Sequence, residues 1–121
     1  MPAVLVVDDE LPLLELVART MLEGGYSVVK ARHGKEAWSF FQRPHESIDL
    51  VITDVVMPQM SGTELEARIA ALRPEVPLIL MSGFSPVDLY ERGLSLSHGH
   101  LITKPFDPTA LLSLVQQLLP K

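Results

Sequence analysis

Five short apolar runs, separated by longer amphipathic stretches, constrain the fold of this chain more than any other feature. Three of the runs are nearly continuous Val, Ile and Leu, a composition typical of strands that are covered on both faces of a sheet. The runs that we predict to be strands are residues 3–7, 27–31, 50–53, 77–81 and 100–103. Because helical patterns lie between them, the strands should form a parallel sheet joined by right-handed crossovers.

The stretches between the runs repeat apolar residues at helical spacing. In the first, Leu14, Val17 and Met21 fall on one stripe, and Gly24 and Gly25 follow as a stop signal. The predicted helices are residues 11–23, 34–42, 62–72, 88–92 and 109–119, of which 88–92 is the shortest. This alternation predicts an α/β fold: a flavodoxin-like, doubly wound, five-stranded parallel sheet with strand order 2-1-3-4-5 and helices on both faces. No repeat or linker divides the chain, so we expect one domain over residues 1–121.

The composition narrows the functional classes. Lys and Arg number 10 and Asp and Glu number 15, a net charge of −5 that disfavours sequence-independent binding to nucleic acid phosphates. No cysteine is present, so disulfides and thiolate metal sites are excluded. The apolar runs are too short to cross a bilayer, and the N-terminal sequence lacks the pattern of a secretory signal. We therefore expect a cytoplasmic domain without membrane insertion or direct binding of nucleic acid.

Polar residues close four of the predicted strands. They are Asp8, Asp9 and Glu10 after the first strand, Asp54 after the third, Ser82 after the fourth and Lys104 after the fifth. In an open parallel sheet, ligands bind beyond the carboxyl ends of the strands, where the strand order reverses. Strands one and three are neighbours in the predicted order, so Asp8, Asp9 and Asp54 should converge. Ser82 and Lys104 should reach the same edge from the other side.

Three carboxylates in a small space need positive charge beside them. Lys104 supplies one charge, and a hard divalent cation such as magnesium (Mg2+), which prefers oxygen ligands, would supply the rest. An acidic cluster that holds magnesium attracts phosphate, and a carboxylate beside the ion can accept a phosphoryl group as an aspartyl-phosphate. Lys104 and the Ser82 hydroxyl would then bind phosphoryl oxygens. The preference of helix N-termini for acids accounts for Glu10, but not for three aspartates that face a lysine.

Four motifs together resemble the receiver domain of two-component response regulators: "VLVVDDE", "LVITDVVMPQMSG", "LILMSG" and "ITKPF". The resemblance runs from the first strand to the last helix, and each motif closes a strand. It implies that Asp54 is the phosphoacceptor and that Asp9 is a direct magnesium ligand, while Asp8 is an acidic partner that acts largely through water. The Val56 backbone carbonyl would be the third protein ligand of the ion. Ser82 would provide the hydroxyl that follows the phosphoryl group, and Lys104 would be the lysine that contacts it. It also implies a cis peptide bond between Lys104 and Pro105.

The resemblance implies a signalling domain rather than an enzyme, one that assists its own phosphotransfer and slow dephosphorylation. The phosphoryl group would come from the phosphohistidine of a histidine kinase or a histidine phosphotransfer domain, and its arrival would switch partner interactions. The C-terminal part of the chain, "MSGF…RGLSLSHGHLITKPFDPTALLSLVQQLL", also resembles receivers at the C-terminal end of hybrid histidine kinases more than receivers that precede DNA-binding domains. An attached kinase core and a free-standing regulator with a separate output protein both remain open.

Three positions shape what we expect of the phosphorylated state. Leu101 stands where receivers commonly carry a Tyr or Phe that turns inward on phosphorylation, so this side chain cannot provide that coupling. By the same resemblance, Val56 and Phe84 flank the path of a water that attacks the aspartyl-phosphate. Both side chains are apolar and cannot orient water, so we expect a long-lived phosphorylated state.

Other protein classes share parts of the pattern. A haloacid-dehalogenase-type phosphatase also forms an aspartyl-phosphate, but it needs a second acid where this chain has Val56. A flavodoxin shares the fold, but its first loop is rich in Ser, Thr and Gly, whereas this loop is Asp8-Asp9-Glu10. The strongest alternative is an interaction module that has kept the fold and lost phosphorylation. Labelling by a small phosphodonor with magnesium distinguishes it from a working receiver.

Overall fold

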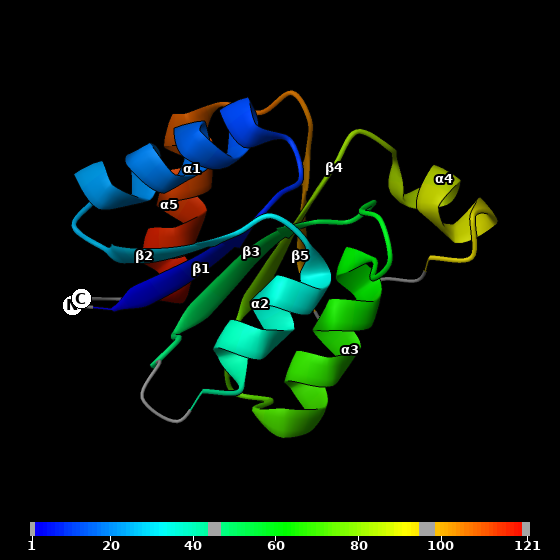
Figure 1. Ribbon diagram of the computed structural model, residues 1–121. Coiled ribbons are helices and arrows are strands. Elements are labelled where there is room, and N and C mark those ends of the chain that lie inside the picture. The colour runs from blue at the N-terminus through cyan, green and yellow to red at the C-terminus, as the bar shows by residue number, and fades with distance from the viewer. Residues whose placement is uncertain (1, 44–46, 95–98, 120–121) are drawn as a thin grey trace.

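The computed structural model describes residues 2–43, 47–94 and 99–119, and within them five parallel strands form one sheet in the order β2-β1-β3-β4-β5 (Figure 1). The strands are β1 (Ala3–Val7), β2 (Ser27–Ala31), β3 (Leu50–Asp54), β4 (Leu78–Ser82) and β5 (His100–Thr103). This is the flavodoxin-like order predicted from the sequence. The order reverses between β1 and β3, the pair that the prediction placed at the centre of the site.

The three central strands are buried on both faces, as their continuous apolar sequences predict. In β1, Leu5 and Val7 belong to the core beneath α2 and α3, whereas Val4 and Val6 belong to the core beneath α1 and α5. Residues of β3 and β4 alternate between the same two cores. A strand with an apolar layer on each side needs apolar residues at every position, which explains why these runs show no polar alternation.

Helices cover both faces of the sheet. They are α1 (Leu11–Glu23), α2 (Gly34–Phe41), α3 (Gly62–Leu72), α4 (Pro86–Glu91) and α5 (Pro108–Leu118). Figure 1 shows α1 and α5 on one face, α2 and α3 on the other, and α4 beyond the end of β4. No helix in the described ranges combines the length and hydrophobicity that a membrane crossing requires.

The predicted bounds of α4 are wrong by two residues at its start. The helix begins at Pro86 because Ser85 is its N-cap, and the Ser85 hydroxyl accepts a hydrogen bond from the Asp88 backbone N–H at 3.1 Å. Proline fits the first helical turn because backbone N–H groups there have no partner within the helix, so the missing N–H of proline costs no hydrogen bond. Only Leu89 of this helix is buried, so apolar periodicity could not mark the first turn.

Two strands extend one residue further than predicted, to Asp54 and Ser82. Backbone hydrogen bonds continue past both residues: Val55 N–H donates to the Met81 carbonyl at 3.0 Å, and Lys104 N–H donates to the Ser82 carbonyl at 2.7 Å. The last residue of each strand is therefore a polar side chain held by the sheet itself. Asp54 and Ser82 therefore lie on the sheet, and Asp8 and Lys104 follow directly after it.

Gly62, the first residue of α3, lies directly against the backbone of Asp54. A Cβ atom at this position would overlap the Asp54 carbonyl oxygen and contact Val55 Cα. The Gly62 N–H donates to the Val55 carbonyl at 2.7 Å. Its lack of a side chain lets α3 begin immediately beneath the end of β3, which fixes the segment that follows Asp54.

Candidate functional site

The register of the sheet brings the predicted polar strand ends to one edge. Val7 pairs with Thr53, Asp54 with Met81, and Ser82 with Thr103. Asp8 and Lys104 each follow directly after a paired strand, so they reach the same level as Asp54 and Ser82. The convergence predicted from strand order is present in the structure.

Lys104 lies among three carboxylates. Its Nζ is 3.3 Å from Asp54 Oδ1, 3.4 Å from Asp8 Oδ2 and 3.8 Å from Glu10 Oε1. The lysine side chain is largely buried, and the peptide bond from Lys104 to Pro105 is cis, as the sequence predicted. One ammonium group thus contacts acids from two strand ends and from the start of a helix.

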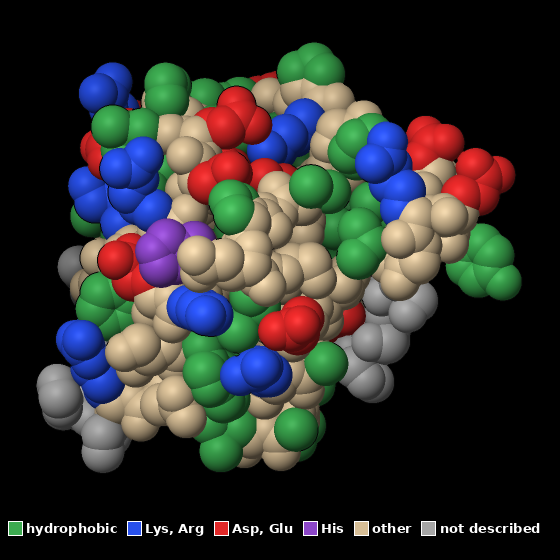
Figure 2. All heavy atoms as spheres, turned by 45° about the vertical axis from the view of Figure 1, so that its right-hand side comes forward, with side chains coloured by type: hydrophobic (Ala, Val, Ile, Leu, Met, Phe, Trp, Pro, Cys, Tyr) green, Lys and Arg blue, Asp and Glu red, His purple; other side chains and the backbone are tan. Residues whose placement is uncertain are grey.

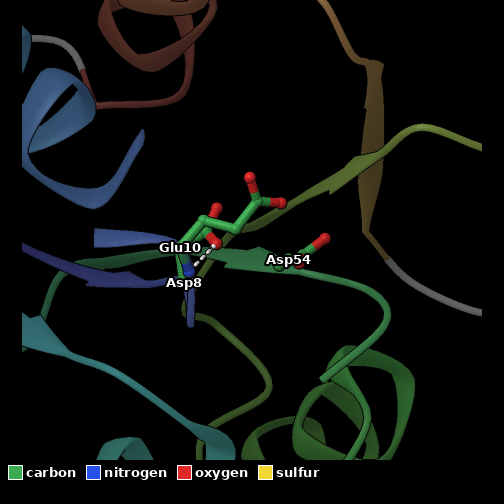
Figure 3. A group of neighbouring side chains, drawn as sticks. All are labelled: Asp8, Glu10 and Asp54. Atoms are coloured by element: carbon green, nitrogen blue, oxygen red, sulfur yellow. Dashed lines mark hydrogen bonds between the residues drawn. The ribbon is translucent and has the colours of Figure 1, made fainter. Parts of the chain in front are cut away.

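Figure 3 shows the carboxyl groups of Asp8, Glu10 and Asp54 near the same edge of the sheet. One oxygen from each lies within 4.8 Å of the others, a spacing that could hold a metal ion. The Glu10 backbone N–H donates to Asp8 Oδ1 at 2.9 Å, which fixes the Asp8 side chain (Figure 3). The donor set consists of carboxylate oxygens, the ligand type that magnesium prefers.

Glu10 is the site residue that sequence reasoning missed. The general preference of helix N-termini for acids accounts for it in the sequence, and it is indeed the N-cap of α1, although its side chain makes no capping hydrogen bond. Its position directly after Asp8-Asp9 was the available signal. Asp9 is exposed and lines the same pocket as Asp54. Its predicted role as a direct magnesium ligand stays a prediction.

Burial and charge act in opposite directions on the pKa values of this cluster. Desolvation raises the pKa of Asp54 from its ordinary 3.8 to about 6, against the attraction of Lys104 and together with repulsion from Asp8 and Asp9. Desolvation also raises the pKa of Asp8, against the Glu10 backbone N–H and Lys104. Burial lowers the pKa of Lys104, but the attraction of Asp54, Asp8 and Glu10 outweighs it, and the net pKa is raised. The site holds more negative charge than one lysine balances.

A pocket of about 280 Å³ opens above Asp54. It is lined by Asp9, Glu10, Asp54, Val56, Ser82, Gly83, Phe84 and Lys104. The Ser82 side chain is buried, and its Oγ accepts a hydrogen bond from the Phe84 backbone N–H at 2.9 Å. Val56 is half exposed, so its side chain borders the pocket rather than the core. All the predicted site residues except Asp8 line this space, and Asp8 lies beneath it in contact with Lys104.

The lining of the pocket carries more acids than bases: Asp9, Glu10 and Asp54 against Lys104. Figure 2 shows acidic side chains near the top of the view with a basic side chain beside them, and further Lys and Arg side chains scattered over the same face. Leu101 is partly buried against the core beneath α2 and α3 and does not line the pocket. Tyr90 is 78% exposed, so it does not replace the missing aromatic ring inside the fold.

Comparison with known proteins agrees with this geometry. The family model for the response regulator receiver domain matches residues 4–116. The response regulator protein FleR of Pseudomonas aeruginosa is 35% identical over 93% of this chain, which covers 23% of FleR. The chain spans about half the length or less of the curated relatives it matches.

Two solved structures extend the comparison. The chemotaxis response regulator CheY4 of Vibrio cholerae is 31% identical, with a TM-score of 0.82 over 98% of this chain and 99% of that one. The receiver domain from the hybrid histidine kinase CckA is 31% identical, with a TM-score of 0.79 over 97% of this chain and 98% of that one. The sheet order, the acidic cluster around a buried lysine and these matches lead to one conclusion: the chain belongs to the response regulator receiver domain family of two-component signalling proteins.

Proposed function

We propose that this domain accepts a phosphoryl group on Asp54 from the phosphohistidine of a histidine kinase or a histidine phosphotransfer domain. The observation that carries the proposal is the placement of Lys104 Nζ, 3.3 Å from Asp54 Oδ1, in a pocket that is open to an incoming group. An ammonium at that position can neutralise phosphoryl oxygens as they arrive.

The transfer forms one bond and breaks another. An Asp54 carboxylate oxygen bonds to phosphorus, the phosphorus–nitrogen bond of the donor breaks, and its electron pair remains on the donor imidazole. Lys104 holds one phosphoryl oxygen, and the Ser82 hydroxyl donates to another. Transfer needs the ionised carboxylate, and burial raises the pKa of Asp54 in the metal-free protein to about 6, so protonation at acid pH would disable the acceptor.

The carboxylate cluster fits magnesium by its donor chemistry. We propose that Asp8, Asp9, Asp54 and the Val56 backbone carbonyl hold the ion, with Glu10 close enough to contribute through water. When bound, magnesium supplies the positive charge that a phosphoryl group needs beside three acids. In metal-free protein, Asp8, Glu10 and Asp54 share the single positive charge of Lys104, which leaves the pocket repulsive to phosphate.

A protein donor needs a surface beside the pocket. A second pocket of about 510 Å³ adjoins the first through Glu10 and Lys104, and it is mainly apolar. Its other lining residues are Pro12, Leu13, Leu16, Pro105 and Phe106. Leu11 and Leu16 are nearly half exposed on α1. We propose that the kinase or phosphotransfer partner packs its helices on this surface and so presents its phosphohistidine to Asp54.

We also propose that residues 1–121 act as one receiver domain in the cytoplasm, through protein partners and without direct contact with nucleic acid. The relatives include a response regulator protein and the receiver of a hybrid kinase. Both arrangements therefore stay open for this chain: an attached kinase core or a separate output protein. After transfer, the domain should lose the phosphoryl group slowly without a partner phosphatase, because Val56 and Phe84 are apolar.

Incubation with an acyl-phosphate donor and magnesium tests the proposal. Intact-mass spectrometry should show one added phosphoryl group on the parent chain, none on the Asp54→Asn variant, and none when a chelator removes the metal. Equal labelling of the variant would contradict Asp54 as the acceptor. A parent chain that is folded but takes no label would instead favour an interaction module that has lost phosphorylation.

A further inference from the structure

Arg92 covers the aromatic side chain that lines the phosphoryl pocket. Its guanidinium carbon lies 3.9 Å from the centroid of the Phe84 ring. Phe84 lines the pocket together with Asp54, and the Phe84 backbone N–H donates to Ser82 Oγ. The Phe84 backbone is therefore held by the proposed phosphoryl-binding hydroxyl, and a cation from the end of α4 covers one face of its ring.

The position of Arg92 suggests that its guanidinium does more than contact solvent. It is the C-cap residue of α4, and its backbone N–H closes that helix, but its side chain is exposed. Among residues 2–43, 47–94 and 99–119, the guanidinium makes no salt bridge. A cation over an aromatic face is attracted by the negative potential of the ring. Arg92 thus restrains Phe84 without entering the pocket itself.

We propose that Arg92 is a positioning residue that holds the Phe84 ring beside the bond to be hydrolysed and thereby prolongs the life of the phosphorylated state. The inference rests on Asp54 phosphorylation, and it adds a residue outside the pocket that sets the hydrolysis rate. In hydrolysis, a water oxygen bonds to phosphorus, the bond from phosphorus to the Asp54 oxygen breaks, and its electron pair returns to the carboxylate. The water proton passes to the released phosphate or to solvent.

The attacking water must come from the side of phosphorus opposite the breaking bond, and we place the Phe84 ring beside that path because Phe84 lines the pocket together with Asp54. Phe84 can swing away from that side only if it leaves the guanidinium. Loss of an exposed cation–π contact corresponds to about a two- to fivefold change in the balance between the two ring positions. The hydrolysis rate should change by the same factor when Arg92 no longer holds the ring.

The experiment measures first-order loss of phosphate from purified, phosphorylated protein in magnesium. We expect Arg92→Gln to lose phosphate about two- to fivefold faster than the parent, and Arg92→Lys, which keeps a cation, to stay close to the parent. Arg43→Gln is the matched control, because Arg43 lies 4.6 Å from the Phe40 ring on α2, away from the pocket. This control should decay at the parent rate.

A double-mutant cycle separates positioning from a structural effect. Phe84→Leu keeps apolar bulk in the pocket but removes the ring face, so it should decay as fast as Arg92→Gln, and combining the two should add nothing. The inference is overturned if Arg92→Gln decays at the parent rate, or if it accelerates decay equally in the Phe84→Leu background. The inference is also overturned if Phe84→Leu alone loses phosphate at the rate of the parent, and this result does not depend on whether Arg92→Gln folds. If the parent takes no phosphoryl group at all, the proposed function itself fails, which is a distinguishable result.

Discussion

Replacing Asp54 with Asn should stabilise the metal-free protein at neutral pH, although the substitution removes the proposed phosphoacceptor. Burial raises the pKa of Asp54 from 3.8 to about 6, so the folded protein carries an ionised carboxylate in a place that resists ionisation. That difference corresponds to about 3 kcal/mol of destabilisation when the group is fully ionised in both states. The asparagine amide avoids this cost, but it needs hydrogen bonds of its own and takes one partner from Lys104. We therefore expect a gain of about 1–3 kcal/mol, with 3 as the upper limit.

The pH dependence gives the sign of the effect. Below about pH 4, the carboxyl group is protonated in the folded and unfolded states, so its charge costs nothing. Between about pH 4 and pH 6, the unfolded chain releases the proton first, and the parent loses stability as pH rises. Above about pH 6 the loss is complete, because the folded protein is ionised too. The advantage of Asp54→Asn should thus be near zero at the acid end of this window and full at pH 7.5.

Thermal melts in chelator at pH 5.0, 6.0 and 7.5 measure this difference. A chain of this size should show a rise in Tm of roughly 4–12 °C for the variant at pH 7.5, shrinking toward pH 5.0. Glu91→Gln is a suitable control because it removes one negative charge from an exposed position on α4. A variant less stable than the parent at pH 7.5, or an advantage that does not change with pH, would refute the reasoning about a buried, unfavourable charge.

Two further predictions concern the metal and the pocket wall. Magnesium should raise the Tm of the parent, because it relieves repulsion among the carboxylates, and this rise should vanish in Asp9→Asn; an equal rise in that variant would place the ion elsewhere. The double substitution Val56→Asn and Phe84→Glu should speed loss of the phosphoryl group by about tenfold or more, because it gives water polar partners, and decay at the parent rate would show that the apolar wall does not control access.

The sequence predicted the fold well because the apolar composition of the central strands and the order of the strands in the sheet agree. Continuous Val, Ile and Leu in β1, β3 and β4 marked strands buried on both faces, and the strand order then placed Asp8, Asp54, Ser82 and Lys104 at one edge. The start of α4 was wrong because a short helix with one buried residue carries almost no periodicity, and its boundary depends on the Ser85 cap.

Two features of the site needed three-dimensional information. In the sequence, Glu10 has the position of an ordinary acid at a helix N-terminus. Only the structure shows that its Oε1 lies 3.8 Å from Lys104 Nζ. Arg92 lies eight residues after Phe84 in the sequence, and no local pattern indicates that its guanidinium returns to cover that ring. Contacts that depend on how a loop and a short helix fold back on a strand end follow from packing, which composition and spacing do not encode.

The central claim is that Asp54, and no neighbouring acid, receives the phosphoryl group. Reductive trapping of the phosphorylated protein with borohydride, followed by proteolysis and peptide sequencing by mass spectrometry, locates the modified residue directly, because an acyl phosphate is reduced to an alcohol and a free carboxylate is not. We predict the reduced residue at position 54 in magnesium and none without the metal. Reduction at Asp8, Asp9 or Glu10 instead, or a label that survives at other residues in Asp54→Asn, would contradict the account.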